Sequence, residues 1–145
     1  MRTRRYAASV ALVCAAAISA CTAGRVLPTL DEAISRLVAD ADLLLLGSSG
    51  LRRSAPQRID DGACVPGEVR GSLRAESERV DASSGLREKL QAMGYDEIAD
   101  DLDLRDGRQD VTVLRDPRTL LTFELTVARG TGVRLVGTTT CYAAS

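Results

Sequence analysis

Apolar residues recur at three- and four-residue steps between Thr29 and Leu46, which predicts an amphipathic helix over this segment. The stripe consists of Leu30, Ala33, Ile34, Leu37, Val38, Ala41, Leu44 and Leu45. Thr29 and Glu32 have the spacing of a capping box, Pro28 precedes them, and Gly47 ends the pattern. The polar face is mainly acidic, the wrong charge for a helix that lies on an anionic membrane. We therefore expect the stripe to pack on a sheet of the same domain.

Alternating apolar and polar residues predict strands downstream of residue 64. Val65–Val80 holds the first strand, and Thr119–Arg129 has the clearest alternation of the chain. Val111–Arg115 forms another strand, and Val133–Thr140 forms the last one, which ends at Cys141. The sequence therefore predicts strands that can share one sheet.

The segments between these strands are less regular. Ser48–Gly62 is rich in Ser, Gly and Arg and is expected to be a loop. Ser84–Met93 is expected to be a second helix, with Gly94 in the left-handed position after it. Asp96–Asp110 fits a helical turn or strands, and the hairpin turn signal Asp106-Gly107 favours strands.

This order of elements predicts an α+β fold: a two-layer sandwich with an antiparallel or mixed sheet of about five strands and two helices on one face. A ferredoxin-like arrangement is one candidate. Strands that begin after Cys64 and end at Cys141 are expected to lie side by side and antiparallel if the two cysteines are bonded.

The N-terminus has the organisation of a secretory signal. Arg2, Arg4 and Arg5 precede Ala7–Ile18, a stretch of twelve uncharged residues. This stretch is shorter than the about 20 residues that a membrane-spanning helix needs. Ile18-Ser19-Ala20-Cys21 then has the form of a lipobox, in which Cys21 carries the lipid and becomes the new N-terminus. An ordinary signal peptide, with Cys21 as a plain thiol, is the alternative.

These boundaries divide the chain into a signal peptide (residues 1–20), a lipid-anchored tether (21–28) and a single domain (29–145). Several acyl chains, such as palmitate, on one cysteine anchor a protein durably. Three of the 19 basic residues lie in the signal, which leaves 16 against 20 acidic residues and a net charge of −4. We expect a location on the extracytoplasmic face of the cell membrane and no nucleic-acid partner.

Cys64 and Cys141 remain once Cys14 leaves with the signal and Cys21 takes the lipid. An even pair in an oxidising compartment predicts a disulfide. Two free thiols or a metal pair are the alternatives, but the chain has no histidine and no C-x-x-C spacing.

The absence of histidine also excludes Ser/His and Cys/His catalytic pairs. A carboxylate pair for glycoside hydrolysis is a third alternative, but the sugar-stacking aromatic residues are missing. We therefore expect no enzyme, no catalytic residue and no cofactor. An acidic cluster is formed by Asp100, Asp101, Asp103, Asp106 and Asp110, but it fails the EF-hand pattern because Arg105 and Thr112 stand at ligand positions. Arg52, Arg53 and Arg58 make residues 48–62 locally basic. They fit either an anion or headgroup contact or an ordinary solvated loop.

Four of these features together resemble the small, uncharacterised lipoproteins of mycobacteria and related actinobacteria, including the LppA-like group. They are the lipobox Cys21, the amphipathic helix Thr29–Leu46, the mid-chain Cys64 that opens a strand, and a last strand that ends in Cys141-Tyr142. The resemblance implies an envelope lipoprotein without a defined activity.

We therefore expect a non-catalytic interaction module that binds an unknown protein or other component of the cell envelope. The alternative is a carrier or sensor of a small apolar ligand. Its cavity would lie between sheet and helices and be lined by residues such as Leu37, Leu44, Leu73 and Phe123.

Overall fold

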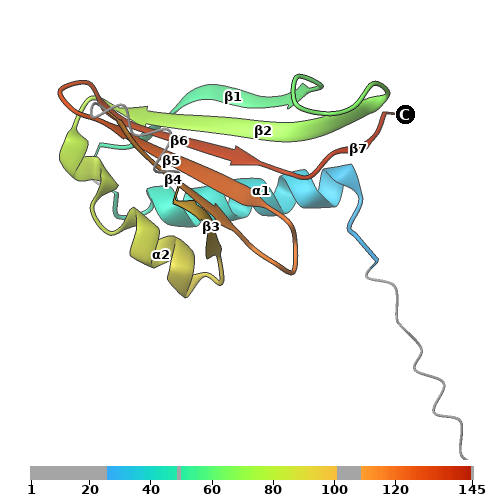
Figure 1. The fold of residues 1–145 in the computed structure, drawn as a ribbon, viewed down its shortest axis with the longest axis horizontal. Coiled ribbons are helices and arrows are strands. Elements are labelled where there is room, and N and C mark those ends of the chain that lie inside the picture. The colour runs from blue at the N-terminus through green and yellow to red at the C-terminus, as the bar shows by residue number, and fades with distance from the viewer. Residues whose placement is uncertain (1–25, 49, 101–108, 145) are drawn as a thin grey trace, which may run out of the picture.

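The computed structural model describes residues 26–48, 50–100 and 109–144, with only the backbone of Ala99 and Asp100 (Figure 1). The signal peptide, Cys21 and most of the tether lie outside these residues. In the described parts, two α-helices and a short 3₁₀-helix accompany a seven-stranded sheet. The elements are α1 (Leu30–Leu45), β1 (Arg52–Asp60), β2 (Glu68–Ser77), η1 (Val80–Ser83), α2 (Leu86–Ala92), β3 (Asp96–Asp100), β4 (Gln109–Arg115), β5 (Thr122–Ala128), β6 (Gly132–Thr138) and β7 (Tyr142–Ala143).

The strands lie in the order β1-β2-β6-β5-β4-β3, all neighbours are antiparallel, and β7 pairs with β2. Both helices cover the same face of the sheet (Figure 1). The fold is thus the expected α+β two-layer sandwich, with more strands than the sequence suggested. The chain runs α-β-β before α2, an order that differs from the β-α-β-β-α-β of a ferredoxin-like fold.

The expected helices are confirmed. Thr29 caps α1 in a capping box, with the Glu32 N–H donating to Thr29 Oγ1 and the Thr29 N–H donating to Glu32 Oε2 at 2.8 Å. A Schellman motif ends α2: the Tyr95 N–H donates to Leu90 O, and Gly94 has φ +97°.

The expected neighbours β2 and β6 are confirmed as an antiparallel pair, in the register Ser72↔Thr138 to Ser77↔Val133. Within Asp96–Asp110, β3 and β4 pair antiparallel, as the strand interpretation requires. The turn signal Asp106-Gly107 lies outside the described residues.

The prediction that Ser48–Gly62 is a loop was wrong, because this segment contains β1. Nearly every residue of β1 is exposed, so the strand has no apolar alternation to recognise. β1 forms an edge of the sheet, and its pairing with β2 shifts register around Pro56. An edge position tolerates proline because one side of the strand needs no ladder hydrogen bonds.

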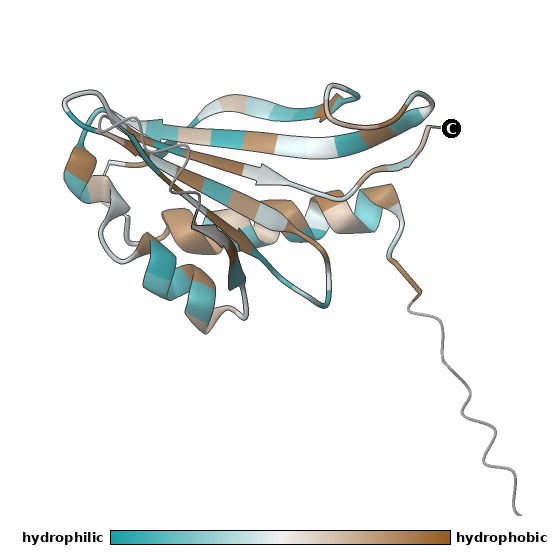
Figure 2. Cartoon of the chain, in the orientation of Figure 1, coloured by the Kyte–Doolittle hydropathy of each residue, from teal (hydrophilic) through white to brown (hydrophobic). Residues whose placement is uncertain are grey.

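The core lies between α1, α2 and the inner face of the sheet. It forms one cluster of buried residues that includes Leu37, Leu44, Tyr95, Phe123 and Leu135. Apolar and polar residues alternate along β2, as Figure 2 shows, so that one face is buried and the other is only partly covered. The helix approaches the sheet closely at two glycines. A Cβ at Gly137 would lie 2.9 Å from Leu37 Cδ1, and a Cβ at Gly71 would collide with Ile34.

Candidate interaction surface

The sheet has one face that the helices leave uncovered, and we call it the outer face (Figure 1). Its side chains alternate with inward residues of β2, β5 and β6 that are buried. The strand registers align outward positions into three rows: Arg52–Glu76–Arg134–Thr126–Val111, Ala55–Arg74–Val136–Glu124–Val113 and Arg58–Ser72–Thr138–Thr122–Arg115. The surface therefore mixes arginine, glutamate, threonine and valine.

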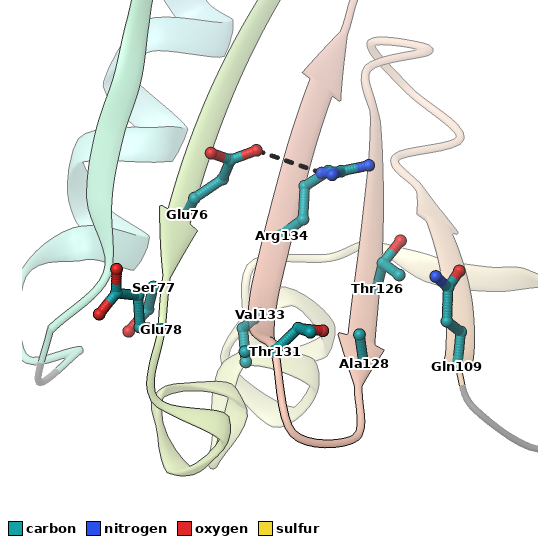
Figure 3. A pocket seen from close by; sticks show the side chains of 10 residues that line it. Glu76, Ser77, Glu78, Gln109, Thr126, Ala128, Thr131, Val133 and Arg134 are labelled. Carbon is teal, nitrogen blue, oxygen red and sulfur yellow. Dashed lines mark hydrogen bonds and ion pairs between the residues drawn. The ribbon is translucent and has the colours of Figure 1, made fainter.

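A first depression of about 410 Å³ lies on the outer face over β2, β6, β5 and the start of β4 (Figure 3). Beside it, Arg134 Nε donates to Glu76 Oε1 at 3.2 Å. The hollow arises because the positions around it carry small residues such as Ala128 and Gly132. Gly132 has φ +115°, and any Cβ there would collide with the Ser77 carbonyl oxygen. This site offers polar contacts to a partner's side chain.

A second depression of about 460 Å³ lies over β1, β2 and β6. Asp60 at its edge accepts hydrogen bonds from Ser72 Oγ at 2.7 Å and Arg70 Nε at 3.2 Å. The Ser72 hydroxyl, and then Arg70, hold the pKa of Asp60 below its usual value despite partial burial. Arg58 and Arg74 also line this depression. Arg74 reaches only Glu76, at 4.0 Å, and Arg58 has no ion pair within the described residues.

The two edges of the sheet are poorly suited to pairing with another strand. β1 carries Pro56 and two register shifts, and β3 begins with Asp96-Glu97 and ends with Asp100. Proline, irregular pairing and charge are the features that oppose edge-to-edge association. A partner is therefore better received on the outer face than along an edge.

One end of the molecule is held together by the disulfide between Cys64 and Cys141, the pair expected from the sequence, with Cα atoms 5.8 Å apart. Cys64 follows β1, and Cys141 precedes β7, which pairs with the start of β2. Burial and then the negative charge of Glu32, at the start of α1, raise the pKa of Tyr142 in β7. The β1–β2 hairpin, the C-terminal segment and the start of α1 therefore meet at this end (Figure 1).

Two carboxylates, those of Asp40 and Asp116, accept hydrogen bonds within the sandwich. Tyr95 Oη donates to Asp40 Oδ2 at 2.7 Å, and burial, followed by this hydrogen bond, raises the pKa of Tyr95 strongly. Asp116 is almost fully buried, which by itself raises its pKa, but the Arg118 N–H and side chain outweigh this and hold the pKa below its usual value. Asp116 accepts from the Arg118 N–H at 2.8 Å. These carboxylates fix α1 and the β4–β5 turn in place.

The sequence did not reveal the role of Lys89. Its Nζ donates to Leu46 O at 2.6 Å, and to Leu43 O and Leu44 O at 3.4 Å, and so caps the C-terminus of α1 from α2. The last turn of α1 has no basic residue of its own. Lys89 is the only lysine in the chain, which was the one signal available.

The other candidate residues are placed as follows. Leu37, Leu44, Leu73 and Phe123 belong to the core cluster and are at most 3% exposed. Asp101, Asp103 and Asp106 lie outside the described residues, and the described residues contain no cluster of acidic or sulfur ligands for a metal. No helix in the described ranges is long and apolar enough to cross a membrane.

Comparisons with models of protein families, with curated proteins and with solved structures found no match to this chain. The fold and the outer face are therefore described from the residues of this chain alone.

Proposed function

We propose that this chain is a lipoprotein of the cell envelope, anchored through acyl chains on Cys21 to the extracytoplasmic face of the membrane, and that its domain is a non-catalytic interaction module. The observation that carries the proposal is the uncovered outer face, with its rows of arginine, glutamate and threonine and its two depressions. The lipobox supports the anchor, and the resemblance to actinobacterial LppA-like lipoproteins supports the class.

The packing between helix and sheet favours this role over that of an apolar-ligand carrier. A Cβ at Gly137 would lie 2.7 Å from Phe123 Cε1 and 2.9 Å from Leu37 Cδ1, so there is no room even for a methyl group at this point. Leu37 and Phe123 are two of the residues that would have lined such a cavity. Their contacts instead stabilise the core.

Mass spectrometry of the membrane fraction tests the anchor. We expect acylated Cys21 as the first residue of the mature protein. The Cys21→Ser variant should leave the membrane fraction, because several acyl chains supply the durable attachment. An unmodified Cys21 in wild-type protein would refute the proposal.

Photo-crosslinking in cells tests the interaction module. A photoreactive side chain in place of Thr126, which lines the first depression, should give a discrete adduct with one envelope component. The matched position is Arg36, which is exposed on α1 in the other layer. The same adducts from both positions, or none from position 126, would contradict a partner on the outer face.

A further inference from the structure

The β1–β2 hairpin lies at the end of the molecule from which the tether leaves. β7 and the Cys64–Cys141 disulfide hold the hairpin beside the start of α1 (Figure 1). Four residues separate Cys21 from Val26, and the five residue steps between them span at most about 18 Å. A lipid on Cys21 would therefore keep the hairpin close to the bilayer.

Two large apolar side chains of this hairpin are exposed. Ile59, near the end of β1, is 59% exposed, and Val65, in the connection to β2, is 62% exposed. Exposed apolar patches mark surfaces that contact a protein or a membrane, and Ile59 and Val65 lie six residues apart on one hairpin. Residue 26, on the tether side, is also an exposed valine.

Arginines accompany these apolar residues. Arg58 and Arg74 line the second depression together with Ile59, and neither makes a close ion pair within the described residues. Arg58 lies opposite Ser72 in the register, and Arg74 follows two residues later on β2, so their side chains are diagonal neighbours. Asp60 is already bound by Ser72 and Arg70, which leaves Asp61 as the remaining acid in this depression.

The net charge of −4 conceals this arrangement, because part of the acidic charge lies on the helix layer. Asp31, Glu32, Asp40 and Asp42 all belong to α1, in the helix layer. Arg53 points to that layer as well, where its Nη2 donates to Asp42 Oδ1 at 2.6 Å. On the outer side, Arg58 has no ion pair within the described residues, and Arg74 makes only the 4.0 Å contact with Glu76.

We propose that the β1–β2 hairpin faces the membrane, with Arg58 and Arg74 on the phosphodiester groups of anionic lipids and Ile59 and Val65 in the headgroup region. The inference rests on the proposed anchor at Cys21. Guanidinium groups bind phosphate oxygens in a bidentate manner. Apolar neighbours and the nearby tether favour a lipid surface over an acidic segment of another protein. The anchored domain then has a fixed orientation, with the end that carries the hairpin toward the bilayer.

The test uses the full lipidated chain reconstituted in vesicles. A benzophenone side chain replaces Ile59 or, as the matched control, Leu43, which is 55% exposed on α1. In phosphatidylglycerol vesicles we expect lipid adducts from position 59 to exceed those from position 43 at least fivefold. In phosphatidylcholine vesicles this difference should disappear. Each arginine near an anionic surface contributes about fivefold in affinity, so Arg58→Gln with Arg74→Gln should lower the adducts more than tenfold.

The control pair Arg36→Gln with Arg129→Gln changes the net charge equally at exposed positions outside the hairpin and should leave the adducts unchanged. Equal adducts from positions 59 and 43, no dependence on lipid charge, or adducts from position 59 in cells only to an acidic protein would overturn the inference. The mass of Cys21 is read on the same sample. An acylated protein without hairpin adducts refutes only the orientation, whereas an unacylated protein refutes the proposed function.

Discussion

Gly137 lies where α1 comes closest to the sheet, and a single methyl group there tests how tightly the two layers are packed. We predict that Gly137→Ala lowers the free energy of unfolding by about 1–3 kcal/mol, because its Cβ would press on Phe123 and Leu37. Urea denaturation measures the change. Gly62→Ala is the matched control, since its Cβ would meet only Asp60 at 3.9 Å and its backbone is unstrained. If both variants unfold alike, the interface is looser than described.

Individual residues also show which features of the structure the sequence predicts. The outward arginines, serine and glutamate of β2 (Arg70, Ser72, Arg74 and Glu76) follow from alternation alone. Their assembly into rows does not, because Glu76 meets Arg134 through a pairing of strands that lie 58 residues apart. Cys64 and Cys141 could be paired in advance only because no other cysteine remains once Cys14 and Cys21 are assigned.

At the scale of elements, local signals predicted α1 and missed β1. A cap and an apolar stripe are both contained within the helix sequence, whereas an exposed edge strand is defined by its neighbour. The end of α1 is likewise completed from elsewhere in the chain. Lys89 reaches its carbonyl oxygens across 43 residues of sequence, a contact that no local pattern encodes.

We predict that Lys89→Met lowers the free energy of unfolding by about 1–2 kcal/mol, because methionine keeps the length of the side chain but leaves the carbonyl groups at the end of α1 without their charged donor. Thermal unfolding measures the loss. Gln91→Met, at an exposed position of the same helix, should change stability by less than about 0.5 kcal/mol. Lys89→Arg should retain most of the stability, and equal effects of Met at both positions would contradict the capping role.

At the scale of the whole molecule, the Cys64–Cys141 disulfide closes 77 residues and joins the hairpin to the C-terminal segment. The loop model gives an upper value of about 4.5 kcal/mol for this length, and we predict that Cys64→Ala with Cys141→Ala costs about 2–4 kcal/mol. Hydrogen exchange should also rise first at the end that the bridge holds, where the Ala144 N–H donates to Gly67 O at 2.9 Å. The central pair β5–β6 should respond only to the global loss. A uniform rise of hydrogen exchange across the sheet would mean that the bridge stabilises the fold without fixing the hairpin. The hairpin would then lack the rigid position from which it is proposed to meet the membrane.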